Sequence, residues 1–345
     1  MIQRGIRFSA YTAAVLLALG SLTGASTATA AVSPAAAPGT KELCGPGSAL
    51  RFDPSAFPAR PRIDNKWFPL KPGMQYTTTG NVISADGTTA RTIVSTVTGL
   101  TKTIDGVKTL VVWDRDYSDG ELVESELAFF AATREGAVWL FGEYPEEYEN
   151  GTLVGAPSTF ISGIDQARAG IAMQAKPRLD TPAYVQAYAP NVDFLDCGDV
   201  FKKDQRVCVP TGCYKDVLVI EESNPLEPPS AGRQRKFYSA GTGLVKVTAV
   251  GGPDEEFQDL VKVKKLTRSE LDSINAQALE QDLRGYTVSK DVYAKTPRAA
   301  VASSSGHGSR GDDGRSGHGG RSGHGGRSGH DDRSGHGGRS GHDYN

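Results

Sequence analysis

The stretch that decides the fold is KTLVVWDRDYSDGELVESELAFFAATREGAVWLFGEY, residues 108–144. It holds three runs in which apolar and polar residues alternate, Lys108–Tyr117, Glu121–Ala131 and Ala137–Tyr144. Asp119-Gly120 separates the first two runs and Glu135-Gly136 the last two, and such pairs favour tight hairpin turns. The segment therefore predicts an antiparallel meander.

The same pattern continues on both sides of this segment. Further strands are predicted at Tyr76–Ile83, Ala90–Thr98, Asp193–Phe201, Arg206–Val209, Tyr214–Glu221, Gln234–Ser239, Leu244–Val250 and Phe257–Lys265. Short connections favour antiparallel pairing, because a parallel pair needs a crossover of a dozen or more residues. A meander of about ten strands must curl or close, since a long open edge invites aggregation. We expect a mainly β fold, a lipocalin-like β-barrel, with a two-sheet sandwich as the alternative.

One segment, residues 155–191, loses the alternation. It is rich in glycine and proline, at Gly155, Pro157, Gly163, Gly170, Pro177, Pro182 and Pro190. A loop of this length inside a compact domain is uncommon and is often functional. The sequence predicts either a lid or binding segment, or an insertion that plugs one barrel end.

After the last strand the pattern becomes helical. Thr267-Arg268-Ser269-Glu270 forms a capping box, and Gly285 supplies a stop signal. The apolar residues of one face are Leu271, Ile274, Ala278, Leu279 and Leu283. We expect an amphipathic helix over 267–284 that docks on the barrel wall.

The two ends of the chain differ from its body. Residues 1–31 resemble a secretory signal, with Arg4 and Arg7, an apolar run from Ala13 to Leu22 and a small-residue cleavage motif at 28–30. We expect 32–43 to be a flexible lead-in, 44–300 a single β-rich domain and 303–345 a disordered tail. The sequence contains no second apolar stretch, so we expect no membrane span. Secretion into the extracellular space or the cell wall is expected.

Histidine and charge exclude several functions for the body. All six histidines lie in the last 39 residues, which excludes a Ser-His-Asp triad and a His-ligated zinc centre before them. The formal net charge is −2, to which the signal contributes two arginines and the tail one net positive charge. The mildly acidic body does not predict nucleic-acid binding.

The tail is a repeat in which Arg-Ser-Gly-His recurs every six residues from Arg315. It contains the histidines His307, His318, His324, His330, His336 and His342. Evenly spaced imidazoles can bind Ni²⁺, Cu²⁺ or Zn²⁺, while contact with anionic wall polymers or an inert spacer are the alternatives. No cofactor is expected for the body.

Four cysteines in an exported chain predict two disulfides. If Lys202-Lys203 is the centre of a hairpin turn, Cys197 faces Cys208, which leaves Cys44 to pair with Cys213. The main competing pairing joins Cys208 to Cys213 across a short turn.

Acidic residues gather in two clusters. The first contains Asp114, Asp116, Asp119, Glu121, Glu124 and Glu126, and the second contains Glu143, Glu146, Glu147 and Glu149. A solvated hairpin explains the first cluster most simply. A cation site and catalysis by paired carboxylates are the alternatives, with Asp114, Asp116 and Glu143 as weak catalytic candidates.

Five aromatic residues on candidate strands are either plain core or the lining of an apolar cavity for a small ligand. They are Trp113, Phe129, Phe130, Trp139 and Phe141.

Four stretches resemble a family of exported bacterial proteins, frequent in actinobacteria, that has no assigned activity. They are Ile63–Gly73, Val138–Glu143, Gly163–Ile171 and Lys236–Val245. The resemblance covers about 60–250 and implies one β-rich exported domain, without any catalytic residue.

These observations predict a secreted, non-enzymatic binding protein, a monomer with an unknown small or polymeric envelope ligand. The alternatives are an extracellular hydrolase that acts on glycan through paired carboxylates, and a structural carrier protein of the cell wall or spore surface.

Overall fold

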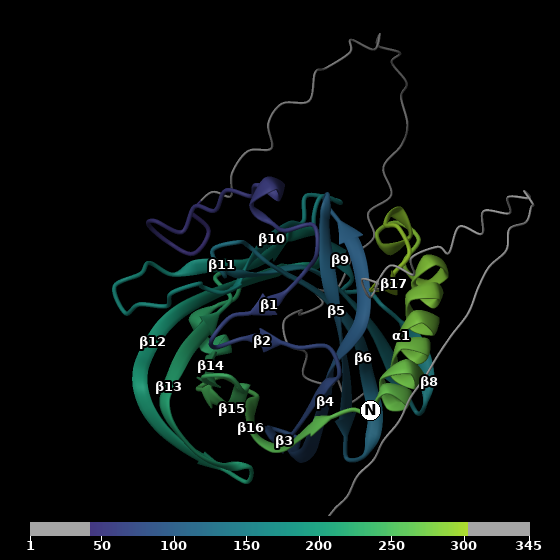
Figure 1. Cartoon of the computed structure of the whole chain (residues 1–345). Helices are drawn as coiled ribbons and strands as arrows, with labels where there is room; N and C mark the ends of the chain where they lie inside the picture. The colour runs from purple at the N-terminus through teal and green to yellow at the C-terminus, as the bar shows by residue number, and fades with distance from the viewer. Residues whose placement is uncertain (1–41, 303–345) are drawn as a thin grey trace, which may run out of the picture. The chain divides into compact units, whose positions relative to one another are not determined.

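The alternating strands and tight turns produce a closed antiparallel β-barrel in the computed structural model, which describes residues 42–302 (Figure 1). Its twelve strands follow the order β10-β11-β12-β13-β14-β15-β16-β3-β4-β5-β6-β7, and pairing of β10 with β7 closes the ring. The strands are β3 (Met74–Ser84), β4 (Gly87–Ile104), β5 (Val107–Ser118), β6 (Glu121–Ala132), β7 (Val138–Glu149), β10 (Arg168–Met173), β11 (Tyr184–Ala189), β12 (Phe194–Val209), β13 (Gly212–Ser223), β14 (Arg233–Ser239), β15 (Gly243–Val250) and β16 (Glu255–Lys265). The predicted barrel is confirmed.

The short elements lie around this barrel. β8 (Thr152–Gly155) and β9 (Phe160–Ile161) pair with β7, and β17 (Ala300–Val301) pairs with β4. β1 (Ile63–Asp64) and β2 (Pro69–Leu70) form a separate two-stranded sheet, here called the plug hairpin.

The plug hairpin packs inside one end of the barrel. Ile63 and Trp67 belong to a buried cluster with residues of β5, β7, β10, β12 and β13, and Figure 1 shows β1 and β2 crossing the barrel. A barrel of twelve strands is wider than the eight-stranded barrels whose own side chains fill the interior. The plug hairpin therefore supplies the apolar filling for this end.

The segment predicted as a long loop instead contains β10 and β11. The prediction of a lid or an inserted plug over 155–191 is wrong, because these strands complete the barrel wall. Gly170 is needed for close pairing, since a Cβ atom there would lie 2.5 Å from the carbonyl oxygen of Val185.

The helix α1 (Arg268–Val288) covers the outer face of the barrel wall and begins with the predicted capping box. It runs past the predicted end at 284, so Gly285 does not stop it. Glycine is needed at this position for packing, since a Cβ atom there would lie 2.4 Å from the ring of Tyr293. The docked face is more polar than predicted: it buries Asn275, Ala278, Gln281, Asp282 and Gly285, whereas Leu283 is exposed.

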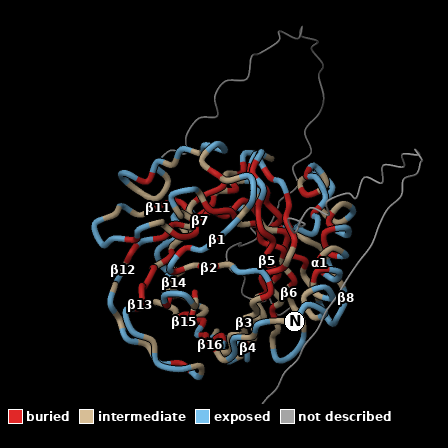
Figure 2. The backbone as a smooth tube through the Cα atoms, in the orientation of Figure 1, coloured by how far each residue is buried: buried red, intermediate tan, exposed pale blue. Residues whose placement is uncertain are grey.

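Polar side chains attach α1 to the barrel. Gln281 accepts hydrogen bonds from Trp113 Nε1 and Ser125 Oγ at 2.8 and 2.7 Å. Lys102, which is fully buried, donates to Asp282 at 2.8 Å. Figure 2 shows the resulting burial along β5, β6 and the facing side of α1.

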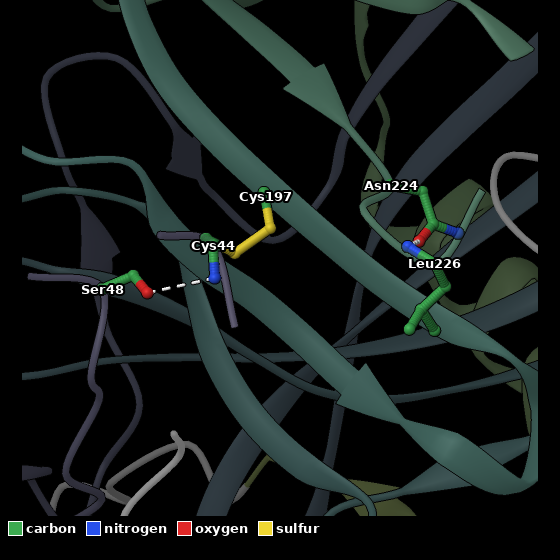
Figure 3. Close-up of a disulfide and its surroundings, with 5 residues drawn as sticks. All are labelled: Cys44, Ser48, Cys197, Asn224 and Leu226. Atoms are coloured by element: carbon green, nitrogen blue, oxygen red, sulfur yellow. Dashed lines mark hydrogen bonds between the residues drawn. A yellow bond between two sulfur atoms is a disulfide. The ribbon is translucent and has the colours of Figure 1, made fainter. Parts of the chain in front are cut away.

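The two disulfides differ from the predicted pairs. Cys44 is bonded to Cys197, as Figure 3 shows, and Cys208 is bonded to Cys213. The predicted pairs Cys197–Cys208 and Cys44–Cys213 are wrong because β12 continues through 202–203, with irregular register against β13, and the chain turns only after Val209. Cys208 and Cys213 then face each other directly across the hairpin.

Candidate functional site

The barrel encloses a cavity of about 270 Å³ below the plug hairpin. One part of its wall is apolar and contains Phe68 and Leu70 of the plug hairpin, Phe130, Leu140, Phe194 and Leu244. The other part carries the carboxyl groups of Asp114, Asp116, Glu124, Glu126, Glu143, Asp196 and Glu222. The cavity is therefore amphipathic, with more acidic than basic side chains.

The alternation of β5 and β6 brings four of these carboxyl groups together. Asp114 lies directly opposite Glu126 in the strand register, and Asp116 lies opposite Glu124. All four line the cavity, so two like-charged pairs face each other across neighbouring strands. Like charges in this arrangement are destabilising, and this repulsion favours protonation or a bound counter-charge.

Burial and mutual repulsion shift the acidity of these groups. Burial raises the pKa of Asp114 to about 6, although a hydrogen bond from Ser95 and the charge of Arg115 oppose this shift. Burial and then the neighbouring Glu143 raise the pKa of Glu126 well above its ordinary value. Burial and the charge of Asp196 do the same for the pKa of Glu143. Asp114 is consequently poised to gain or lose a proton near pH 6, and Glu126 and Glu143 keep their protons to a higher pH than exposed glutamates do.

Two basic side chains compensate part of the acidic wall. Arg91 of β4 pairs with Asp116 and also lies 3.3 Å from Glu256. Burial raises the pKa of Asp116 to about 6 in spite of the Arg91 charge. Lys236 of β14 pairs with Glu222 at 2.5 Å. Burial alone would lower the pKa of Lys236, but Glu222, Asp196 and Glu143 raise it, so this lysine stays charged.

Two polar atoms in the cavity wall are buried without a hydrogen-bond partner. They are Oδ1 of Asp114 and Oε1 of Gln186. The Gln186 side chain is only 7% exposed, and its amide nitrogen donates to Glu222 at 3.0 Å. Buried acceptors are normally satisfied, so both atoms indicate a place for a hydrogen-bond donor.

The apolar part of the cavity is fixed by the plug hairpin. The Phe68 ring lies 5.5 Å from the ring of Phe130 and 6.0 Å from that of Tyr238, measured between centroids. Asn65 holds the hairpin in place: its amide donates to the carbonyl groups of Gly136 and Gln174, and its oxygen accepts from the backbone of Trp67 at 2.8 Å. The apolar wall is thus a built part of the fold.

The structure brings the three weak catalytic candidates, Asp114, Asp116 and Glu143, into this one cavity. The interpretation of the first acidic cluster as a solvated hairpin is correct only at the turn, where Asp119 and Glu121 are exposed. Its other members point into the barrel. In the second cluster, Glu146 is buried away from the cavity and accepts from Arg284 of α1 at 2.7 Å.

Four of the five aromatic candidates lie on the other side of the wall. Trp113, Phe129, Trp139 and Phe141 pack in one cluster with Ala278 of α1, whereas Phe130 alone of the five lines the cavity. Sequence reasoning missed Arg91, Gln186 and Lys236, because isolated polar residues on separate strands leave no local motif.

The part of the chain that the structure describes contains no candidate metal site. Among 42–302, no three acidic or cysteine side chains lie close enough to hold one ion. The tail histidines at 307, 318, 324, 330, 336 and 342 lie outside the described residues, as do the expected signal at 1–31 and nearly all of the lead-in. No described helix has the length and apolar composition needed to cross a membrane.

Comparisons with known proteins give two structural similarities. No family model matches the chain, and no curated protein matches it. A Bacteroides fragilis protein described as exported, with a YmcC-like fold, is 17% identical, with a TM-score of 0.34, 58% of this chain covered and 99% of that protein. A protein of Parabacteroides distasonis described as a lipoprotein is 12% identical, with a TM-score of 0.31 and coverages of 57% and 97%. At these scores neither similarity assigns a ligand or an activity.

Proposed function

We propose that this chain is an exported, non-enzymatic protein that binds a small molecule inside the barrel. The observation that carries the proposal is the cavity, which combines an apolar wall with buried acceptors that have no protein partner. Ligand sites are commonly concave and mostly apolar, with a few placed polar groups, and the cavity volume of about 270 Å³ is close to the lower end of their range, about 300 Å³. A barrel filled by its own side chains would have favoured a structural carrier instead.

Export is supported by the signal-like sequence of 1–31 and by the two disulfides. Disulfides form and persist in oxidising compartments and are rare in the cytosol. We place the protein in the extracellular space or the cell wall.

Native mass spectrometry tests the binding function. Protein purified from the producing culture, without denaturation, should carry the extra mass of a small molecule. Ala172→Phe places a ring in the cavity, since Ala172 lines it, and should remove that mass. Ala276→Phe, on the exposed face of α1, is the matched control and should keep the mass.

Thermal unfolding of all three proteins shows whether the cavity variant folds, because an added ring costs about 1–3 kcal/mol in a packed interior. A folded Ala172→Phe variant that retains the ligand mass would contradict binding inside the barrel. Wild-type protein without any bound mass would contradict the binding function itself.

A second candidate, an extracellular hydrolase acting on glycan, is favoured by one observation. Asp114, Asp116 and Glu143 line one cavity, and burial raises the pKa of each. Such carboxyl pairs serve as acid and base in glycosidases. Release of reducing sugar from cell-wall glycan by the wild type, and its loss in Glu143→Gln, would support this candidate. If the wild type releases no sugar, the hydrolase is ruled out and the binding function is retained.

For the histidine repeat we propose an association with Ni²⁺, Cu²⁺ or Zn²⁺. Calorimetry of the full chain with Ni²⁺ should give heat of binding, and a variant with all six histidines changed to glutamine should give none. Equal heats from the two proteins would overturn this proposal.

A further inference from the structure

The acidic part of the cavity contains more carboxyl groups than basic side chains. Five strands contribute its carboxyl groups: Asp114 and Asp116 on β5, Glu124 and Glu126 on β6, Glu143 on β7, Asp196 on β12 and Glu222 on β13. Glu256 on β16 lies next to them, 3.3 Å from Arg91. The facing cations are Arg91, which is shared by Asp116 and Glu256, and Lys236, which pairs with Glu222. Among the salt bridges of residues 42–302, none joins Asp114 or Glu126, which face each other, to a basic residue.

A cation is the ligand that relieves this arrangement most directly. It would lie between the like-charged side chains that face each other across β5 and β6, and its N–H groups would satisfy the buried oxygen of Asp114. Hydrogen bonds to ionised groups are stronger than neutral ones. An anion or a plain hydrocarbon would leave this oxygen unsatisfied.

The spacing of the carboxyl groups favours an organic cation over a metal ion. Within 42–302 no three acidic groups converge on a single point. Calcium requires six to eight oxygen ligands around one centre. The aromatic rings of Phe68, Phe130 and Tyr238 beside the acidic wall instead suit the body of a larger molecule.

From this geometry we propose that the cavity selects an organic amine with an apolar body: the ammonium head lies against Asp114 and Glu126, and the body lies against the Phe68 wall. This inference rests on the proposed binding function and names its ligand class.

Binding of the amine is coupled to proton release. The carboxyl groups must be ionised to hold the head, and burial raises the pKa of Asp114 to about 6, so Asp114 takes up a proton in the empty cavity as pH falls below about 6. An alkylamine stays charged throughout this range, as the lysine side chain does. Affinity therefore falls as pH drops through about 6, by about tenfold between pH 8 and pH 5 for each such group.

Calorimetry with three matched probes tests the proposal. 4-Phenylbutylamine, 4-phenylbutanol and 4-phenylbutyrate share one body and differ in the head group. At pH 8 the amine should bind at least tenfold more tightly than the alcohol, and the acid should be weakest. At pH 5 the amine should lose about tenfold in affinity while the alcohol stays unchanged.

Variants distinguish the head-group contact from general packing. Asp114→Asn should lower the affinity for the amine and flatten the pH dependence of that affinity, without changing the affinity for the alcohol. Asp86→Asn, in the exposed β3–β4 turn, should change neither affinity. Alcohol and amine of equal affinity would overturn the amine assignment while leaving the binding function intact. Displacement of the amine by Ca²⁺ would also overturn it. If no probe binds and native mass spectrometry finds no ligand, the proposed function fails as well.

Discussion

Asp114 is the residue that most strongly determines the electrostatics of the cavity. It faces Glu126 across the strand register, and one of its oxygens is buried without a partner. Neither property follows from the sequence stretch Asp114-Arg115-Asp116, which is equally compatible with a solvated hairpin. The difference lies in which face of β5 points into the barrel.

The raised pKa of Asp114 also determines how the stability of the ligand-free protein should depend on pH. Its pKa is about 6 in the fold and 3.8 ordinarily, so the folded state binds more protons between these values. The contribution is fully present below about pH 4 and is lost as pH rises through about 6, at most about 3 kcal/mol. Urea unfolding between pH 4.5 and 7.5 should show stability falling with pH, less steeply in Asp114→Asn. The same slope in both proteins would disprove the assignment.

Among the elements, the strands were predictable and their orientation was not. Alternation predicts two faces for a strand but does not say which one is inside. In β5 and β6 the apolar face, with Trp113 and Phe129, points outward because α1 covers it. The acidic face is thereby turned inward, so residues predicted to be solvated line the cavity.

β10 and β11 escaped prediction for a different reason. β11 is buried along nearly its whole length, so its sequence lacks the alternation of apolar and polar residues that marks a half-exposed strand. The strand partners that would reveal it, β12 on one side and β10 on the other, are contacts made only in the folded barrel.

The plug hairpin gives a prediction at the same scale. Asn65 satisfies two backbone carbonyl groups and two backbone N–H groups with one side chain. Asn65→Ala leaves these groups without partners and should lower the free energy of unfolding by about 1–3 kcal/mol. Asn81→Ala, at an exposed position of β3, should change it by less than about 0.5 kcal/mol. Equal effects in urea unfolding would show that Asn65 does not hold the hairpin.

At the scale of the whole molecule, the two disulfides should differ in their contribution to stability. Cys44–Cys197 spans 153 residues, whereas Cys208–Cys213 spans 5. Loss of a native disulfide costs about 2–5 kcal/mol, and more for longer loops. The double variant Cys44→Ala/Cys197→Ala should therefore be the less stable of the two double variants. Disulfide mapping by peptide mass spectrometry checks the pairing, and a Cys44–Cys213 peptide would contradict the structure.

The body and the tail divide the titrating groups of the chain between them. Every histidine lies after residue 303, and in the body burial raises the pKa of Asp114 and of Asp116 to about 6. The absence of histidine from the body excluded several enzyme classes, but it did not indicate that buried carboxyl groups take over the pH dependence. That property required the barrel to be closed.

Calorimetric titration of 4-phenylbutylamine at pH 8 into wild-type and Ala172→Phe protein tests the central claim most directly. Binding inside the barrel predicts saturable one-to-one binding to the wild type and its loss in a folded Ala172→Phe variant. Equal affinity in both proteins would place the amine elsewhere and contradict the account.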